Sequence, residues 1–142
     1  MADLNDSLSC PARWPELAAA AARSHLLSRP EAIEDFPFGP EVAVYKIAGK
    51  MFATLGFSAG TARINLKCDP DEAQFLRKMF DAVQPGYHMN KTHWNTLVLD
   101  GSIPPGEIER MMDGSFALVV KGLKKAERQR LVITYGREAL FR

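Results

Sequence analysis

The chain has 142 residues, 46% of them hydrophobic and 25% charged, and its 18 Lys and Arg nearly balance 17 Asp and Glu. This length and average composition predict one soluble domain, and they exclude disordered, fibrous and strongly basic nucleic-acid-binding proteins. Two cysteines allow one disulfide at most, and no apolar run approaches the roughly 20 residues that a bilayer requires. We therefore expect a cytoplasmic protein, not bound to a membrane, that folds without a metal ion or other cofactor.

Basic residues are concentrated toward the C-terminal end. From residue 118 onward, seven Lys and Arg outnumber two Glu. A basic end on a nearly neutral chain can bind phosphate groups or an acidic partner. It can equally be the solvated face of a helix, whose long side chains cover the core while their charges stay in water. The composition leaves both interpretations open.

The N-terminal part of the sequence predicts a tail, a helix and a connector. Residues 1–12 are polar and without pattern, as in a flexible tail. Apolar residues then recur at spacings of three and four, which predicts an amphipathic helix that packs on the sheet and ends before Arg29-Pro30. These apolar residues are Trp14, Leu17, Ala18, Ala21, Ala22 and Leu26. Residues 30–40 hold three Pro and one Gly, which is typical of a turn-rich connector.

The next segment predicts a meander of three antiparallel strands. Segments 42–48 and 51–57 are rich in β-branched and aromatic residues and flank a turn at Gly49-Lys50. A third strand is expected over 61–67, where apolar and polar residues alternate. One face of this strand must therefore be buried. The other face is polar and basic and carries Arg63, Asn65 and Lys67.

A second helix is expected after the meander. Asp69 is a favourable N-cap, Pro70 suits the first helical position, and Glu72 completes a capping box with Asp69. The helix should turn an apolar stripe toward the core. That stripe consists of Phe75, Leu76, Met79 and Phe80.

The last third of the chain predicts a hairpin followed by helices. A turn at 83–86 leads into residues 87–99, which are expected to form a second β-hairpin. A short helix is expected near 104–112, and Ser115 should begin the last helix. The segment 131–135 fits a strand or a helical extension equally well.

Together these elements predict an α+β fold. It consists of an antiparallel five-stranded sheet with helices packed on it, in the order α-β-β-β-α-β-β-α, with one extra short helix. We expect the flexible tail over 1–12, one domain over 13–127 and a C-terminal extension over 128–142.

The segment from His88 to Trp94 (HMNKTHW) is the most distinctive motif of the chain. Its two His residues, even with Cys68, do not supply the ligands of a zinc site at typical spacings, so no metal site is expected. No nucleophile motif surrounds Cys68, and Gly49-Lys50 lacks the preceding glycine of a phosphate-binding loop. We therefore expect a protein that is not an enzyme.

Exposed basic and aromatic residues have alternative interpretations. Phe38, in the rigid turn Pro37-Phe38-Gly39, is expected to close the edge of the sheet or cover the core. Four basic residues lie on strands or turn tips, where they can contact a nucleic-acid backbone or protect strands against aggregation. These four residues are Lys50, Arg63, Lys67 and Lys91.

Five segments in series resemble the MmcQ/YjbR family of small bacterial proteins. They are PFG (37–39), VYKIAGKMFATL (44–55), INLKCDP (64–70), PGYHMNKTHWNT (85–96) and SFALVVKGLKK (115–125). The likeness spans about residues 14–126. It implies a CyaY-like, or secretion-chaperone-like, fold.

The resemblance also implies DNA binding through a double wing of β-hairpins. In this sequence the implied DNA-binding residues are Lys46, Lys50, Arg63, Lys67, Lys91, Lys121, Lys124 and Lys125. Motif residues that could contact a ligand or a partner are Phe38, Tyr87, His88, Asn90, His93 and Trp94.

We therefore expect a non-enzymatic protein, a monomer or weak homodimer, that binds DNA weakly and mainly through phosphates. The alternatives are a protein-interaction or chaperone-like module and a small-ligand-binding domain. A contiguous positive face would favour DNA, and an exposed apolar patch would favour a protein partner. A cleft lined by the segment 88–94 would favour a ligand.

Overall fold

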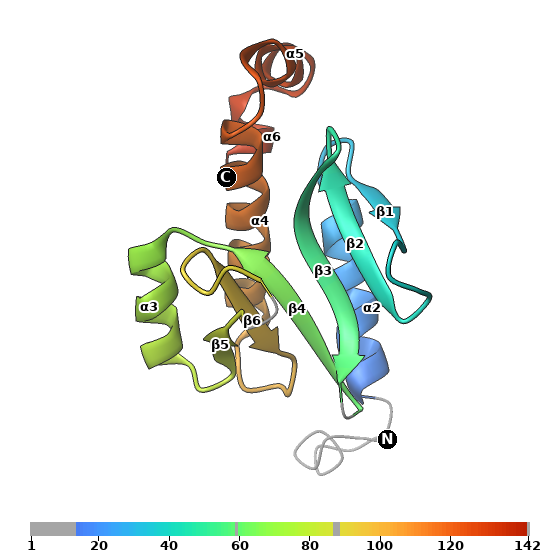
Figure 1. The fold of residues 1–142 in the computed structure, drawn as a ribbon, viewed down its shortest axis with the longest axis vertical. Coiled ribbons are helices and arrows are strands. Elements are labelled where there is room, and N and C mark those ends of the chain that lie inside the picture. The colour runs from blue at the N-terminus through green and yellow to red at the C-terminus, as the bar shows by residue number, and fades with distance from the viewer. Residues whose placement is uncertain (1–13, 59, 87–88, 142) are drawn as a thin grey trace.

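The computed structural model describes residues 14–58, 60–86 and 89–141, so the predicted tail lies outside the described residues. They form an antiparallel sheet with helices packed on it, which confirms the α+β class (Figure 1). In chain order the elements are α2 (Trp14–Leu27), β1 (Ile33–Asp35), β2 (Val42–Ile47), β3 (Lys50–Ser58), β4 (Thr61–Lys67), α3 (Pro70–Met79), β5 (Val83–Pro85), β6 (Trp94–Val98), α4 (Pro105–Lys121), α5 (Lys125–Tyr135) and α6 (Arg137–Leu140).

The sheet has six strands in the order β1-β2-β3-β4-β6-β5, so the prediction of five strands is wrong. β1 lies in the segment for which the sequence predicts a connector, and it pairs with β2. β5 occupies the predicted turn at 83–86 and pairs with β6, so the strand that pairs with β6 begins before the predicted hairpin over 87–99. Both added strands are three residues long, too short for an alternating pattern to be recognised. As an edge strand, β5 also tolerates Pro85.

A bulge in β3 marks the point where β3 and β4 separate. Tyr45 pairs with Ala53 and Lys46 pairs with Met51, which leaves Phe52 as the extra residue. Beyond this point the β3–β4 ladder ends, and the two strands diverge in Figure 1. The hydroxyl of Ser115 in α4 fills the gap, because it donates to the Phe52 carbonyl and accepts the backbone N–H of Lys67 at 2.8 Å. One helix residue thus satisfies backbone groups of both strands.

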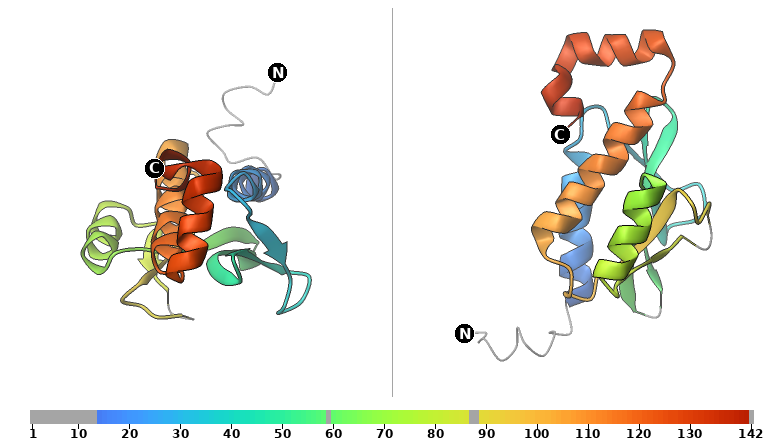
Figure 2. Two further views of the ribbon diagram at one scale, coloured as in Figure 1. Left: turned by 90° about the horizontal axis from the view of Figure 1, so that it is seen from above. Right: turned by 90° about the vertical axis from the view of Figure 1, so that its left-hand side faces the viewer.

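Helices α2 and α4 lie on one face of the sheet, and the turned views show no described element over the opposite face (Figure 2). We call these the covered face and the open face. Alternation along the strands supplies the covered face with buried side chains, among them Tyr45, Ile47, Ile64 and Leu66. The ring of Phe52 packs edge-on against Phe116 of α4, with 5.1 Å between the ring centroids.

The first two amphipathic helices bury narrower stripes than the sequence predicts. In α2, Leu26 is fully buried, but Leu17 is 48% exposed. In α3, Leu76 is buried, whereas Phe75 and Met79 are 57% and 53% exposed. Because α3 packs beside β5 at the edge of the sheet, only one line of its side chains reaches the core.

The C-terminal part is more helical than the sequence indicates. α4 runs without a break through Gly114 and Ser115, where the sequence predicts two helices. The buried hydroxyl of Ser115 binds the sheet, and this tertiary contact compensates for a glycine that costs about 1 kcal/mol in a helix. The segment 131–135 is helical, as part of α5. Among the described residues, no helix has both the length and the apolar character needed to cross a membrane.

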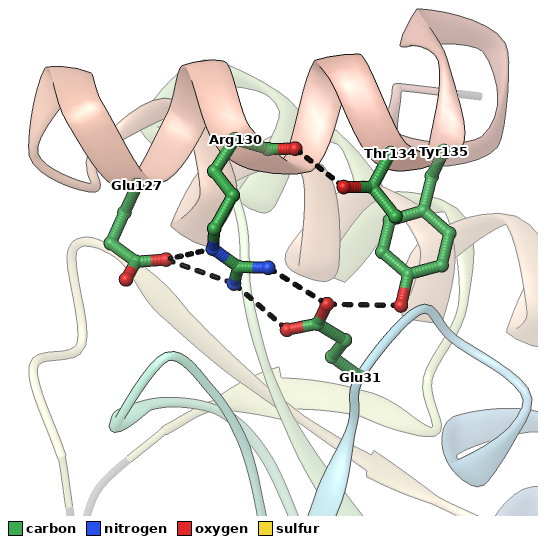
Figure 3. Close-up of polar contacts among 5 residues, drawn as sticks. All are labelled: Glu31, Glu127, Arg130, Thr134 and Tyr135. Carbon is green, nitrogen blue, oxygen red and sulfur yellow. Dashed lines mark hydrogen bonds and ion pairs between the residues drawn. The ribbon is translucent and has the colours of Figure 1, made fainter.

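Residues of the predicted C-terminal extension contribute to the core. Leu131 of α5 and Leu140 of α6 are both almost fully buried. The extension is also held by Arg130, whose guanidinium binds the carboxylate of Glu31 at 2.9 and 3.0 Å (Figure 3). The Tyr135 hydroxyl donates to the same carboxylate at 2.9 Å. The hydrogen bond from Arg130 is the largest cause that lowers the pKa of Glu31, and the hydrogen bond from Tyr135 is the next largest.

Candidate nucleic-acid interface

The open face is built by the residues that alternate with the core. Along β4, Ala62, Ile64 and Leu66 are buried against the helices, whereas the residues between them are partly exposed. Those intervening residues are Arg63, Asn65 and Lys67. The predicted polar and basic face of this strand is therefore confirmed, and the pairing register extends it over the neighbouring strands.

A row of uncharged polar side chains crosses four adjacent strands of the open face. Asn65 of β4 pairs with Thr54 of β3 and with Thr96 of β6, and Thr96 pairs with Gln84 of β5. The Asn65 amide donates to the Thr54 hydroxyl at 2.8 Å, and its oxygen accepts a hydrogen bond from the Thr96 hydroxyl. These bonds fix the orientation of the Asn65 side chain. We call these four residues the polar row.

Cationic side chains lie on both sides of the polar row. Lys67 follows Asn65 by two residues and pairs with Trp94 of β6. Arg63 precedes Asn65 by two residues, and its Nε is buried without a hydrogen-bond partner among the described residues. None of the ion pairs found within the described ranges involves Arg63 or Lys67.

The open face of β2 to β6, all of whose strand residues are described, contains no carboxylate. Asp35 of the edge strand β1 is the nearest acidic residue in this register, and it binds Lys46 at 3.2 Å. The hydrogen bond from Lys46 lowers the pKa of Asp35. Lys46 is thus partly neutralised, while the two cations on β4 are not.

Several carboxylates away from the open face have local partners. Glu34 accepts two hydrogen bonds from Arg23, at 2.7 and 2.8 Å, and one from the Tyr45 hydroxyl at 2.7 Å. Arg23 is the largest cause that lowers the pKa of Glu34. Glu72 binds Arg110 at 2.9 Å. The side chain of Asp69 forms no cap bond, so the predicted capping box is absent.

Asp113 of α4 is held by His25, in the last turn of α2, and by Arg29, which follows that helix. Its Oδ1 lies 2.9 Å from His25 Nε2 and 3.2 Å from Arg29 Nη1. Arg29 is itself buried. Like Glu34 and Glu72, this carboxylate has a cationic or imidazole partner on the covered side of the molecule.

The eight implied DNA-binding residues lie in several places and do not form one contiguous surface. Lys46, Arg63 and Lys67 are on the open face, as described above. Lys50 is exposed at the tip of the β2–β3 hairpin, where Ala48 and Gly49 adopt positive φ angles of 50° and 80°. The two-residue turn is therefore Ala48-Gly49, one residue earlier than predicted.

The remaining implied basic residues lie in a loop and at the α4–α5 junction. Lys91 is exposed in the loop before β6, and its carbonyl accepts a hydrogen bond from Arg77. Lys121 Nζ lies 5.7 Å from the centroid of the Phe141 ring. Lys124 and Lys125 are exposed where α5 begins.

The HMNKTHW motif forms a braced loop in its described part, which begins at Met89. Arg77 of α3 donates to the Asn95 side chain at 2.7 Å and to the Trp94 carbonyl at 3.4 Å. Gly86 N donates to the Trp94 carbonyl at 2.9 Å, and a Cβ on Gly86 would lie 2.9 Å from the Trp94 Cβ. Sequence reasoning missed Arg77, because its partners are distant along the chain.

The other motif residues are placed as follows. Asn90 accepts the backbone N–H of Thr92 through its side chain at 2.9 Å, and His93 is exposed. Tyr87 and His88 lie outside the described residues. Phe38 is 76% exposed, so the prediction that it covers the core is wrong.

Cys68 is not arranged as a nucleophile. Burial, followed by the effect of Glu72, raises the pKa of its thiol to about 12. Its Sγ lies 3.7 Å from a Glu72 oxygen. Within the part of the chain that the structure describes, no group of three or more His, Cys, Asp or Glu side chains is placed to hold a metal ion.

A family model described as YjbR matches residues 27–118, more than half of the chain. The chain belongs to the YjbR family. The matched segment contains the whole sheet and most of α4, whereas α5 and α6 lie beyond it. The open face described above is therefore part of the region that defines a YjbR protein.

Relatives of this YjbR protein include two uncharacterized proteins. It is 38% identical to YbdF of Escherichia coli O157:H7 over 96 residues. This alignment covers 68% of this chain and 79% of YbdF. It is 34% identical to YjbR of Escherichia coli strain K12 over 87 residues, and this alignment covers 61% of this chain and 74% of that protein.

Two solved structures have a similar fold. The Deinococcus radiodurans protein DR2400, whose domain is described as DUF419, superposes with a TM-score of 0.71 at 37% identity over 77% of this chain and 83% of its own. A protein from Pseudomonas syringae gives a TM-score of 0.59 at 29% identity, over 67% of this chain and 92% of its own.

Proposed function

We propose that this YjbR protein binds DNA, and that the open face supplies the contacts to its phosphates. The observation that carries the proposal is the charge of that face. Lys46, Arg63 and Lys67 project from β2 and β4, and no carboxylate shares the open face of β2 to β6 with them. Phosphate oxygens are the complementary ligands of such a surface.

The nearly neutral net charge is compatible with this proposal because the charges are unequally distributed. Glu34 and Glu72, away from the open face, have arginine partners. Their charges are thereby offset locally, whereas the cations of β4 have no carboxylate partner among the residues that the structure describes. Three cations are few for a DNA-binding surface. We therefore expect dissociation constants of about micromolar or weaker at physiological salt, as for non-specific binding.

The proposal is for a binding protein and not for an enzyme. Cys68 has a raised thiol pKa, whereas a nucleophilic cysteine needs a lowered one. His25 is engaged by Asp113 on the covered side. These contacts favour structural roles for the two residues.

The test is a titration of labelled duplex DNA of random sequence at a series of salt concentrations between about 50 and 200 mM. Lys67→Ala and Arg63→Gln should each weaken binding to all sequences alike. Each should also reduce the slope of log K against log salt by about 0.9, which is the expectation for the loss of one phosphate contact. Circular dichroism verifies that each variant is folded.

Lys125→Ala is the matched control, because Lys125 is exposed at the start of α5 and not on the open face. It should leave the salt slope unchanged. If Lys125→Ala lowers the slope while the two open-face variants do not, the contact surface is at the α4–α5 junction and the proposal is wrong. If folded wild-type protein binds no DNA, the proposal is wrong and the alternative function, a protein-interaction module, replaces it.

A further inference from the structure

We infer that the open face binds single-stranded nucleic acid, with bases lying on the polar row and on Trp94. This inference rests on the proposed function, and it names the class of nucleic acid that the same surface accepts. Three features of the surface carry it: its width, the free hydrogen-bonding capacity of the polar row, and an aromatic ring beside a cation.

The width of the sheet does not match the grooves of an undeformed duplex. Six strands at a spacing of about 4.8 Å make a surface roughly 24 Å across, whereas the major groove of B-DNA is about 12 Å wide. A helix or a two-stranded ribbon fits such a groove, and a broad sheet reaches the base edges of a duplex that is strongly bent and unwound. Bases that are unpaired and turned outward can contact side chains in the middle of this sheet without that deformation.

Asn65 of the polar row has a hydrogen-bond donor and an acceptor that no described residue uses. The Asn65 amide uses one N–H toward Thr54 and one oxygen lone pair toward Thr96. One donor and one acceptor remain on an amide whose orientation is already fixed. An amide with this pair of groups matches the edge of a base. Gln84 and Thr96 continue the row over β5 and β6.

Trp94 supplies an aromatic surface next to the row. It is partly exposed, precedes Thr96 by two residues on β6, and is opposite Lys67 of β4. Its backbone is fixed by hydrogen bonds with Gly86 and Arg77. Stacking of a base on an aromatic ring contributes about 1–3 kcal/mol and is tolerant of sequence. The point at which the ring is attached to the sheet is therefore fixed before a base stacks on it.

The two cations of β4 complete the arrangement. Arg63 and Lys67 each lie two residues from Asn65 on the same side of the strand, which is about 7 Å in either direction. Phosphates of a strand whose bases cover the polar row therefore have a cation on each side of that row. Neither cation has a carboxylate partner among the described residues that would compete with phosphate.

The experiment compares three labelled probes at one salt concentration: an unstructured DNA strand of about 20 nucleotides, the RNA of the same sequence, and the DNA duplex. We expect the protein to bind at least one single strand about 10-fold more tightly than the duplex. Trp94→Ala should weaken single-strand binding about 10-fold, the order expected for one lost stacking contact, and Trp94→Phe should restore most of it. Neither variant should change duplex binding.

Two further variants keep the test decisive if Trp94→Ala unfolds the protein. Asn65→Ala should weaken single-strand binding about fivefold through the lost hydrogen bonds to a base. Phe75→Ala, in an aromatic residue of α3 that is 57% exposed, is the matched control and should change nothing.

The outcomes separate this inference from the proposed function. If the duplex binds as tightly as both single strands, and Asn65→Ala binds all probes like the wild type, the inference is wrong while DNA binding stands. If none of the probes binds, both are wrong. Preference for the DNA or the RNA strand identifies which of the two the surface selects.

Discussion

Alternate residues of β4 serve two surfaces with different physical roles. Ala62, Ile64 and Leu66 are buried under α2 and α4, where they stabilise the fold. The alternate residues of the same strand lie on the open face, and two of them are cations without a carboxylate partner among the described residues. The covered face therefore carries the free energy of folding, and the open face is available for contacts with another molecule.

The largest expected effect is on the covered face. Phe116→Ala removes a ring that is 1% exposed and packs against Phe52. The variant should lose about 3–5 kcal/mol of unfolding free energy, measured by urea denaturation, because it leaves a cavity in the core. Phe38→Ala, at a side chain that is 76% exposed, is the control and should stay within about 0.5 kcal/mol of the wild type. Similar losses in the two variants would contradict the assignment of the core.

A smaller effect is expected where α4 joins the sheet. Ser115→Ala leaves the Phe52 carbonyl and the Lys67 N–H without their shared partner. Burying these unsatisfied groups should cost about 1–3 kcal/mol in the same urea experiment. Ser58→Ala, at the exposed end of β3, should have almost no effect. An unchanged Ser115→Ala variant would mean that the sheet opening is not held by this hydroxyl.

A local and pH-dependent effect is expected at the C-terminal helices. The pKa of Glu31 is below its ordinary value of 4.5 because the ionised carboxylate binds Arg130 and Tyr135. A group with a lowered pKa in the folded state stabilises it above the unfolded pKa, and the contribution is lost as the pH falls through the folded pKa. Hydrogen exchange of α5 should therefore be slower near pH 7 than below the pKa of Glu31, after correction for the intrinsic rate.

The matched variants for this prediction are Glu31→Gln and Glu138→Gln. Glu31→Gln should remove most of the pH dependence of α5 protection, whereas Glu138→Gln, at an exposed site on α6, should preserve it. A pH dependence that persists unchanged in Glu31→Gln would show that another group controls the docking of α5.

The smallest effect is expected on the open face itself. Lys67→Ala should change the unfolding free energy by no more than about 0.5 kcal/mol, because the side chain has no ion pair within the described ranges. Urea denaturation of this variant also serves as the folding control for its DNA titration. A loss above about 1 kcal/mol would remove the distinction between the two faces.

The sequence by itself determined the elements that have a clear local pattern. Strict alternation along β4, the turn between β2 and β3 and the proline-led start of α3 are all visible in short windows. The segments that resemble the YjbR family added the family assignment, and the family model confirms it. Local patterns are sufficient here because alternation, turn residues and a helix start are each encoded within a few consecutive residues.

Only the tertiary structure decided the elements and contacts that depend on distant residues. β1 and β5 are three-residue edge strands that exist because β2 and β6 offer unpaired backbone groups. α4 continues through Gly114 because Ser115 binds two strands. For the same reason the polar row could not be foreseen: Thr54, Asn65, Thr96 and Gln84 are separated along the chain, and only the pairing register brings them side by side. Sequence shows which residues alternate, but the neighbour of each one across the sheet is set by long-range hydrogen bonds between strands.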